Sequence, residues 1–109
     1  MRILVAVQPT MCRETIAHCI RINRPDNEVR LAAPDSLEGE ATSFRPHLLV
    51  CNDNAPQVKG GSIPSRVVVR YHDSLDTSVF LNDQAPRLFQ DMTIEELLGV
   101  VEEAQRLIA

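Results

Sequence analysis

The stretch RPHLLVCNDNAPQVKG, residues 45–60, decides the fold of this chain. The four apolar residues at 48–51 predict a short strand that is buried on both faces of a parallel sheet. A polar turn follows, in which Asn52 is followed by Pro56 four positions later and by Gly60 four positions after that. We therefore expect a buried strand that ends in a polar turn at Asn52.

Upstream of this stretch, apolar runs alternate with helical periods. The continuous apolar run at 3–7 predicts a buried strand, and a helix is expected from a capping Thr10 through about Ile22. A second strand is predicted at 28–33 and a short helix at 34–44, where Leu37, Ala41 and Phe44 share one face. Strand, helix, strand, helix, strand in this order implies right-handed crossovers and a doubly wound parallel sheet.

Downstream, the chain again shows strand and helix patterns. Residues 66–71 predict a strand, and TIEELLGVVEEAQRLIA predicts a helix from Thr93, whose first turn carries acidic residues near its positive end. Between them, apolar residues at 79–81 and 88–89 flank the turn-forming sequence at 82–86. This part is typical of strand, turn, strand.

Composition limits the function classes. The chain has 109 residues, enough for one core and a single domain at 1–109, and 44% of them are apolar. No apolar run approaches a membrane span, and the start MRILVAV is too short for a secretory signal. The net charge of −4 argues against nucleic-acid binding. Three cysteines without CxxC spacing indicate a reducing cytoplasm rather than a disulfide framework.

The layout around Asn52 resembles the receiver domains of response regulators, in which a phosphoacceptor aspartate closes the third strand with proline and glycine at these offsets. The end of the chain, RLFQDMTIEELL, also resembles the last strand and helix of receivers. The resemblance implies an α/β, flavodoxin-like, doubly wound five-stranded parallel sheet. Because only KGGSIPS and a turn separate Asn52 from the next strand, we expect the third helix to be lost. We expect the fourth helix to be replaced by extended chain.

The residues of receiver chemistry are replaced throughout. Val7, Gln8 and Pro9 stand where receivers carry the acidic pair that binds Mg²⁺, so we expect no metal and no cofactor. The hydroxyl position maps near Arg70 or Tyr71, and the lysine position maps to Gln90 or Asp91. A shift of one residue would make Asp53 the acceptor, but it would break both offsets. The predicted degenerate phosphoacceptor pocket consists of Gln8, Asn52, Asp53, Tyr71 and Gln90.

The other reactive residues are better explained as structural. Cys12 and Cys19 fall on the apolar face of the first helix, and Cys51 lies in the central strand. No set of His, Cys and Asp residues has metal-ligand spacing. An alternative function is a small flavodoxin-like enzyme, for example a phospho-cysteine carrier. Such a carrier needs a cysteine directly after the first strand, whereas Cys12 comes five residues after Val7.

The favoured hypothesis is a receiver-like protein that is not an enzyme and cannot be phosphorylated. It would act as a protein-protein interaction module in bacterial signalling or regulation, with an unidentified protein partner and no nucleic acid or membrane. A sheet face left without its helix predicts a homodimer, although the segment 72–86 could instead fold over the gap and leave a monomer. The predicted interface residues are Val79, Phe80, Leu88, Phe89, Val100 and Leu107.

Overall fold

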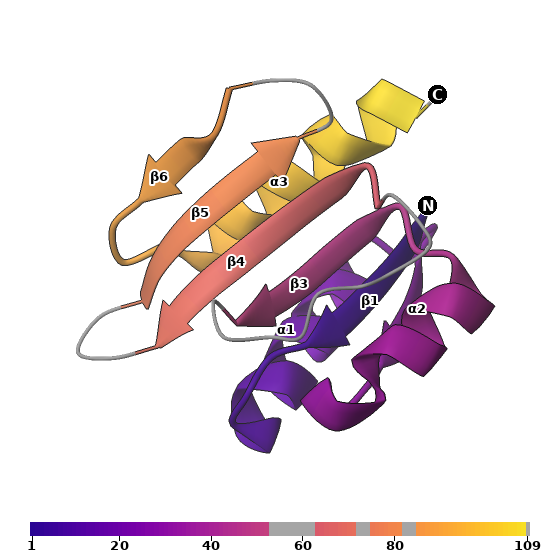
Figure 1. Ribbon diagram of the computed structural model, residues 1–109. Coiled ribbons are helices and arrows are strands. Elements are labelled where there is room, and N and C mark those ends of the chain that lie inside the picture. The colour runs from indigo at the N-terminus through magenta and orange to yellow at the C-terminus, as the bar shows by residue number, and fades with distance from the viewer. Residues whose placement is uncertain (53–62, 72–74, 82–84, 109) are drawn as a thin grey trace.

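A six-stranded mixed sheet with the strand order β2-β1-β3-β4-β5-β6 forms the centre of the molecule (Figure 1). The computed structural model describes residues 1–52, 63–71, 75–81 and 85–108. Its elements are β1 (Arg2–Ala6), α1 (Thr10–Asn23), β2 (Glu28–Leu31), a short 3₁₀ helix (Pro34–Ser36), α2 (Leu37–Phe44), β3 (Leu48–Asn52), β4 (Ser65–Tyr71), β5 (Leu75–Leu81), β6 (Arg87–Phe89) and α3 (Ile94–Ile108).

The first half of the chain folds as its pattern predicts. Strands β2, β1, β3 and β4 are parallel neighbours, and the predicted apolar face of α2 is buried. One detail differs, because the residue preceding α1 is Pro9 and Thr10 is already helical. Helix α2 ends at Phe44 and is capped by Arg45, which adopts the left-handed conformation with φ 53°. Pro46 follows and cannot continue the helix.

The expectation of a five-stranded, wholly parallel sheet was wrong. Strand β5 is antiparallel to β4, and β6 is antiparallel to β5, so the sheet is mixed and has six strands. The two predicted strands are confirmed by β5 and β6, which pair antiparallel with Val79 level with Arg87 and Thr77 level with Phe89. Part of the predicted turn, residues 82–84, lies outside the described residues. The expected loss of the third helix concerns residues 53–62, which lie outside the described residues, so it stays a prediction.

The two faces of the sheet are covered differently. Helices α1 and α3 pack on one face, and α2 packs on the other over β1 and β3 (Figure 1). Alternation along each strand divides the core accordingly, since Val5 and Val50 face α1 and α3 while Leu4 and Leu49 face α2. The described helices include none that is both long and apolar enough to cross a membrane.

Helix α3 has a capped N-terminus and forms ion pairs with residues next to α1 and in β6. Thr93 and Glu96 form a reciprocal capping box, in which the Glu96 N–H donates to Thr93 Oγ1 and the Thr93 N–H donates to Glu96 Oε1. Two ion pairs join the helix to other elements. Glu102 of α3 pairs with Arg24, which follows α1, and Glu103 of α3 pairs with Arg87 of β6. These contacts hold α3 against both α1 and the outer strands.

Candidate functional site

Asn52 is the last residue of β3 and lies at the carboxyl end of the parallel strands. Its side chain forms hydrogen bonds that connect three strands. Its Oδ1 accepts a hydrogen bond from the Gln8 backbone N–H at 2.7 Å. Its Nδ2 donates to the carbonyl oxygens of Gln8, at 3.4 Å, and of Val69, at 3.5 Å. The side chain therefore links the end of β1 to the end of β4 across β3.

Those bonds use both functional groups of an amide at once. The acceptor oxygen faces the Gln8 N–H, while the donor nitrogen faces two carbonyl oxygens, an arrangement that a carboxylate cannot reproduce because it has no donor. The gap between β1 and β3 is the point where the strand order reverses, which is where open α/β sheets bind ligands. In this chain a side-chain amide bridges that gap.

Gln90, another residue of the predicted pocket, is not brought to Asn52. Gln90 follows β6, and two strands, β4 and β5, separate β6 from β3. Register places Phe89 level with Thr77, and Thr77 level with Val69, so Gln90 reaches the same edge of the sheet but about 14 Å away from Asn52. Tyr71 is the last residue of β4, and Asp53 lies outside the described residues.

The place of the receiver's acidic pair carries no metal ligand. Val7 is buried in the core, Gln8 is engaged by Asn52 through its backbone, and Pro9 precedes α1. In the part of the chain that the structure describes, no three His, Cys, Asp or Glu side chains gather closely enough to hold a metal ion. The absence of Mg²⁺ binding stays a prediction.

Cys51 is held as an unreactive thiol. Burial raises its pKa to about 11, although the charge of Arg66 opposes the shift. Cys12 and Cys19 are only half-buried. Because the thiolate is the reacting form, we expect iodoacetamide to modify Cys51 at least about tenfold more slowly than the other two cysteines in the folded protein at pH 8. Mass spectrometry of peptides over a time course measures these rates, and equal rates would contradict the burial.

His47 provides a titratable link between β1 and the start of β3. The Arg2 N–H donates to His47 Nδ1 at 3.0 Å, which requires that nitrogen to be unprotonated. Burial and, to a lesser degree, the positive charge of Arg2 lower the pKa of His47 from 6.5. The unfolded chain therefore takes up this proton first, so the stabilisation is complete above pH 6.5 and is lost as the pH falls through the lowered pKa.

We expect the free energy of unfolding of the wild type to decrease as the pH is lowered from 6.5. The substitution His47→Asn should remove the part of this decrease that comes from protonation of His47. The asparagine oxygen replaces Nδ1 as an acceptor but does not titrate. Urea unfolding of both proteins from pH 8 to pH 5 separates the His47 contribution from that of the carboxyl groups. Parallel pH profiles for the two proteins would show that His47 contributes nothing.

A small apolar cavity of about 70 Å³ lies between the helices and the sheet. It contains no titratable side chain, so it supplies space but no acid, base or nucleophile. Its lining residues come from α1, β3, β4, β5 and the start of α3, and are Ile16, Val50, Val67, Val69, Thr77, Met92, Thr93, Ile94 and Leu97.

Two residues of the predicted dimer interface are in the core. Val79 is 1% exposed and Val100 is 2% exposed, so this part of the interface prediction was wrong. Val79 points to the α3 side of the sheet, and Val100 is covered because α3 contacts α1 as well as the sheet. Phe80 and Phe89 are half-buried. Leu88 and Leu107 are 77% and 38% exposed, which leaves them accessible to a partner.

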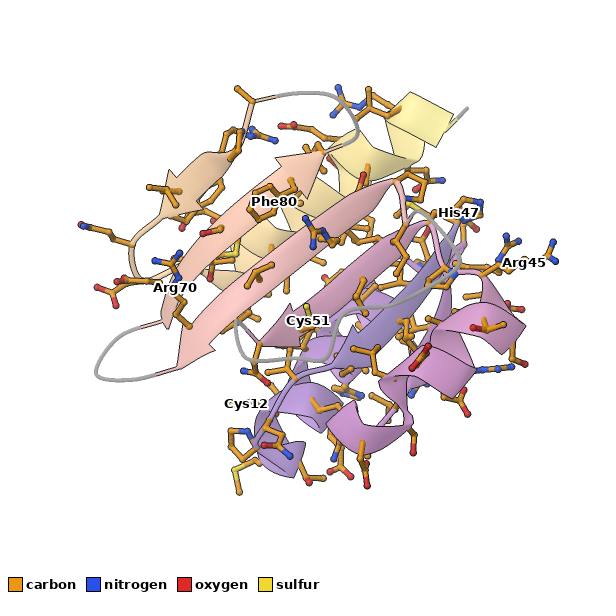
Figure 2. The ribbon with its side chains drawn as sticks, viewed as in Figure 1. Cys12, Arg45, His47, Cys51, Arg70 and Phe80 are labelled. Atoms are coloured by element: carbon orange, nitrogen blue, oxygen red, sulfur yellow. The ribbon has the colours of Figure 1, made fainter. Side chains whose placement is uncertain are left out.

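The sheet face opposite α3 brings two residues of the predicted interface, Phe80 and Leu88, together with residues that the sequence did not predict there, namely Arg66, Val68 and Arg70. None of the described helices lies over this face at β4, β5 and β6, and Figure 2 shows the Phe80 ring on it. We call this surface the open face; its residues are Arg66, Val68, Arg70, Phe80 and Leu88, and the register places Asp76 and the buried Ser78 on the same side. The signal was the alternation of SRVVVRY, in which both arginines fall on the side opposite the buried valines.

No family model and no curated protein matches this sequence. Among solved structures, HypX from Aquifex aeolicus in complex with tetrahydrofolic acid is similar over 99% of this chain and 26% of that chain, with a TM-score of 0.53 and 14% identity. A variant of HypX with four substitutions gives a TM-score of 0.51 and 15% identity, over 99% of this chain and 27% of that one. The chain thus spans about a quarter of HypX, and the likeness shows the α/β fold alone.

Proposed function

We propose that this chain is a receiver-like protein-binding module that works without phosphorylation. The observation that carries the proposal is the Asn52 side chain, whose amide bridges the end of β1 and β4. The sequence resemblance assigns this position to the receiver's acceptor aspartate. An amide has no carboxylate to attack a phosphoryl donor. The proposed role is therefore binding to another protein, in the bacterial cytoplasm that the resemblance implies.

The direction and order of the strands support the receiver comparison. Flavodoxin-like sheets have the strand order 2-1-3-4-5, and the order here is the same if β6 is taken as the last strand and β5 as an antiparallel insertion. Two reversals make β6 run in the same direction as β4. The pairing of α1 with α3 on one face and α2 on the other also fits a doubly wound fold.

The alternative of a phospho-cysteine carrier is not favoured by any contact. Cys12 lies within α1 and packs against the core, rather than in a loop of free amides after β1. The folate of the HypX complex is not carried over to this chain, because a likeness at 14% identity concerns the fold only.

The absence of phosphorylation is tested with acetyl phosphate and Mg²⁺ followed by intact mass measurement. We expect no phosphoryl adduct, because the predicted pocket offers neither the nucleophile nor the metal ligands. A phosphorylatable receiver domain of a response regulator, treated in parallel, verifies that the acetyl phosphate is active. A stable, acid-labile adduct on this chain, at Asp53 or elsewhere, would overturn the proposal.

Partner binding is tested by photo-crosslinking in the source cells. A crosslinking amino acid is placed singly at four exposed positions on different surfaces, Met11, Ile22, Leu88 and Leu107. We expect one discrete protein to be captured from at least one position, and the purified pair to bind when mixed. If no position captures a protein that binds on reconstitution, the proposed interaction function is wrong.

A further inference from the structure

The open face carries two arginines that have no oxygen partner in the described part of the chain. Among the residues that the structure describes, the Arg70 side chain has no hydrogen bond or ion pair, and the Arg66 guanidinium lies over the Phe80 ring, with 5.0 Å from its carbon to the ring centroid. Most other arginines of the chain bind oxygen. Those with a carboxylate partner are Arg24, Arg30 and Arg87, and those that donate to a backbone carbonyl include Arg2, Arg13 and Arg21.

The two guanidinium groups are placed at a defined spacing. Arg66 and Arg70 are four residues apart on β4, which separates their Cα atoms by about 13 Å, and Val68 lies midway between them on the same face. Asp76 is opposite Arg70 in the register, so the positive charge is greater at the Arg66 end. Stacking of Arg66 on Phe80 leaves its N–H groups free at the edge of the plane, where they can bind a carboxylate.

We propose that the open face binds an extended, acidic segment of a partner protein. Two of its carboxylates, four residues apart, pair with Arg66 and Arg70, and an apolar side chain between them packs on Val68 and Phe80. This inference rests on the proposed function and names the partner's chemistry. A protein segment is favoured over a nucleic acid because the chain carries a net charge of −4 and the face offers only two cations.

The proposal is tested with an acetylated, amidated heptapeptide of sequence TETLTET, in which the two glutamates and the leucine share one side of an extended chain. Titration into the labelled protein is followed by amide chemical shifts. We expect saturable shifts at Val68 and Phe80, and an affinity that weakens as salt is added. The control peptide TQTLTQT has the same shape without charge and should bind at least about tenfold more weakly.

A matched pair of variants locates the binding. Arg66→Gln with Arg70→Gln should weaken the peptide affinity at least about tenfold. Arg45→Gln with Arg106→Gln removes the same charge from two other exposed arginines that lie away from the open face, and it should leave the affinity unchanged. Amide spectra verify that both variants are folded.

Several outcomes would overturn the inference. These are equal binding of the neutral peptide, equal losses in the two variants, tighter binding of an eight-nucleotide oligothymidylate, or concentration-dependent shifts on the open face without any peptide. The last result would identify a second copy of the chain as the occupant. A peptide that does not bind, in a chain that takes up no phosphoryl group and captures a partner through another surface, rejects this inference while the proposed function stands.

Discussion

The substitution Val100→Glu is expected to destabilise the fold by about 4 kcal/mol or more, which is much of the stability of a domain of this size. The Val100 side chain is 2% exposed and lies in the core between α3, α1 and the sheet. An ionised carboxylate placed there has no partner and loses its hydration. Urea unfolding followed by circular dichroism measures the effect.

The matched control is Leu107→Glu on the same helix. Leu107 is 38% exposed, so its carboxylate can remain in water and the cost should be about 1 kcal/mol or less. Val100→Ala, which removes apolar contacts without adding charge, should cost about 2 kcal/mol. If both glutamate variants were equally stable, the placement of Val100 in the core would be incorrect. Only Leu107→Glu is therefore suitable for testing a dimer interface.

The local elements of this fold could be predicted because their signals lie within a few residues. The unbroken apolar run of β1, the i, i+4, i+7 pattern of α2 and the Thr93–Glu96 capping box each specify one element without reference to the others. The antiparallel insertion of β5 could not be found in this way. The sequence LDTSVFL indicates a strand at its apolar end but not which strand it pairs with. Its antiparallel place beside β4 depends on a reversal of the chain between Tyr71 and Leu75, where no glycine, proline or apolar period gave a signal.

The same distinction between local and long-range signals explains which residues of the site could be predicted. Asn52 and Gln8 meet as expected because both follow adjacent parallel strands, β3 and β1. Gln90 does not join them, since β5 displaces β6 from β4. The burial of Val100 depended on helix packing, because the apolar stripe of α3 had to be wide enough to meet both α1 and the sheet. A helical wheel drawn for α3 alone does not contain that information.

The substitution Asn52→Asp is expected to lower the free energy of unfolding by about 1 to 3 kcal/mol at pH 7 and to leave the protein unphosphorylated. The new carboxylate would keep the bond from the Gln8 N–H. Its second oxygen, however, would face the carbonyl oxygens of Gln8 and Val69, to which the wild-type amide donates. Without acidic residues after β1, no Mg²⁺ would be bound to neutralise the phosphoryl oxygens.

Asn52→Leu is the companion variant, because it removes both the donor and the acceptor without adding charge. It should be destabilised by about 1 kcal/mol, since the exposed polar groups of Gln8 exchange their partner for water while the link to β4 is lost. Urea unfolding and intact mass after acetyl phosphate are measured for both. An Asn52→Asp protein as stable as the wild type would show that the amide is not a structural bridge. Efficient labelling of that variant would show that the edge of the sheet still binds a metal, and that the loss of phosphorylation depends on one residue alone.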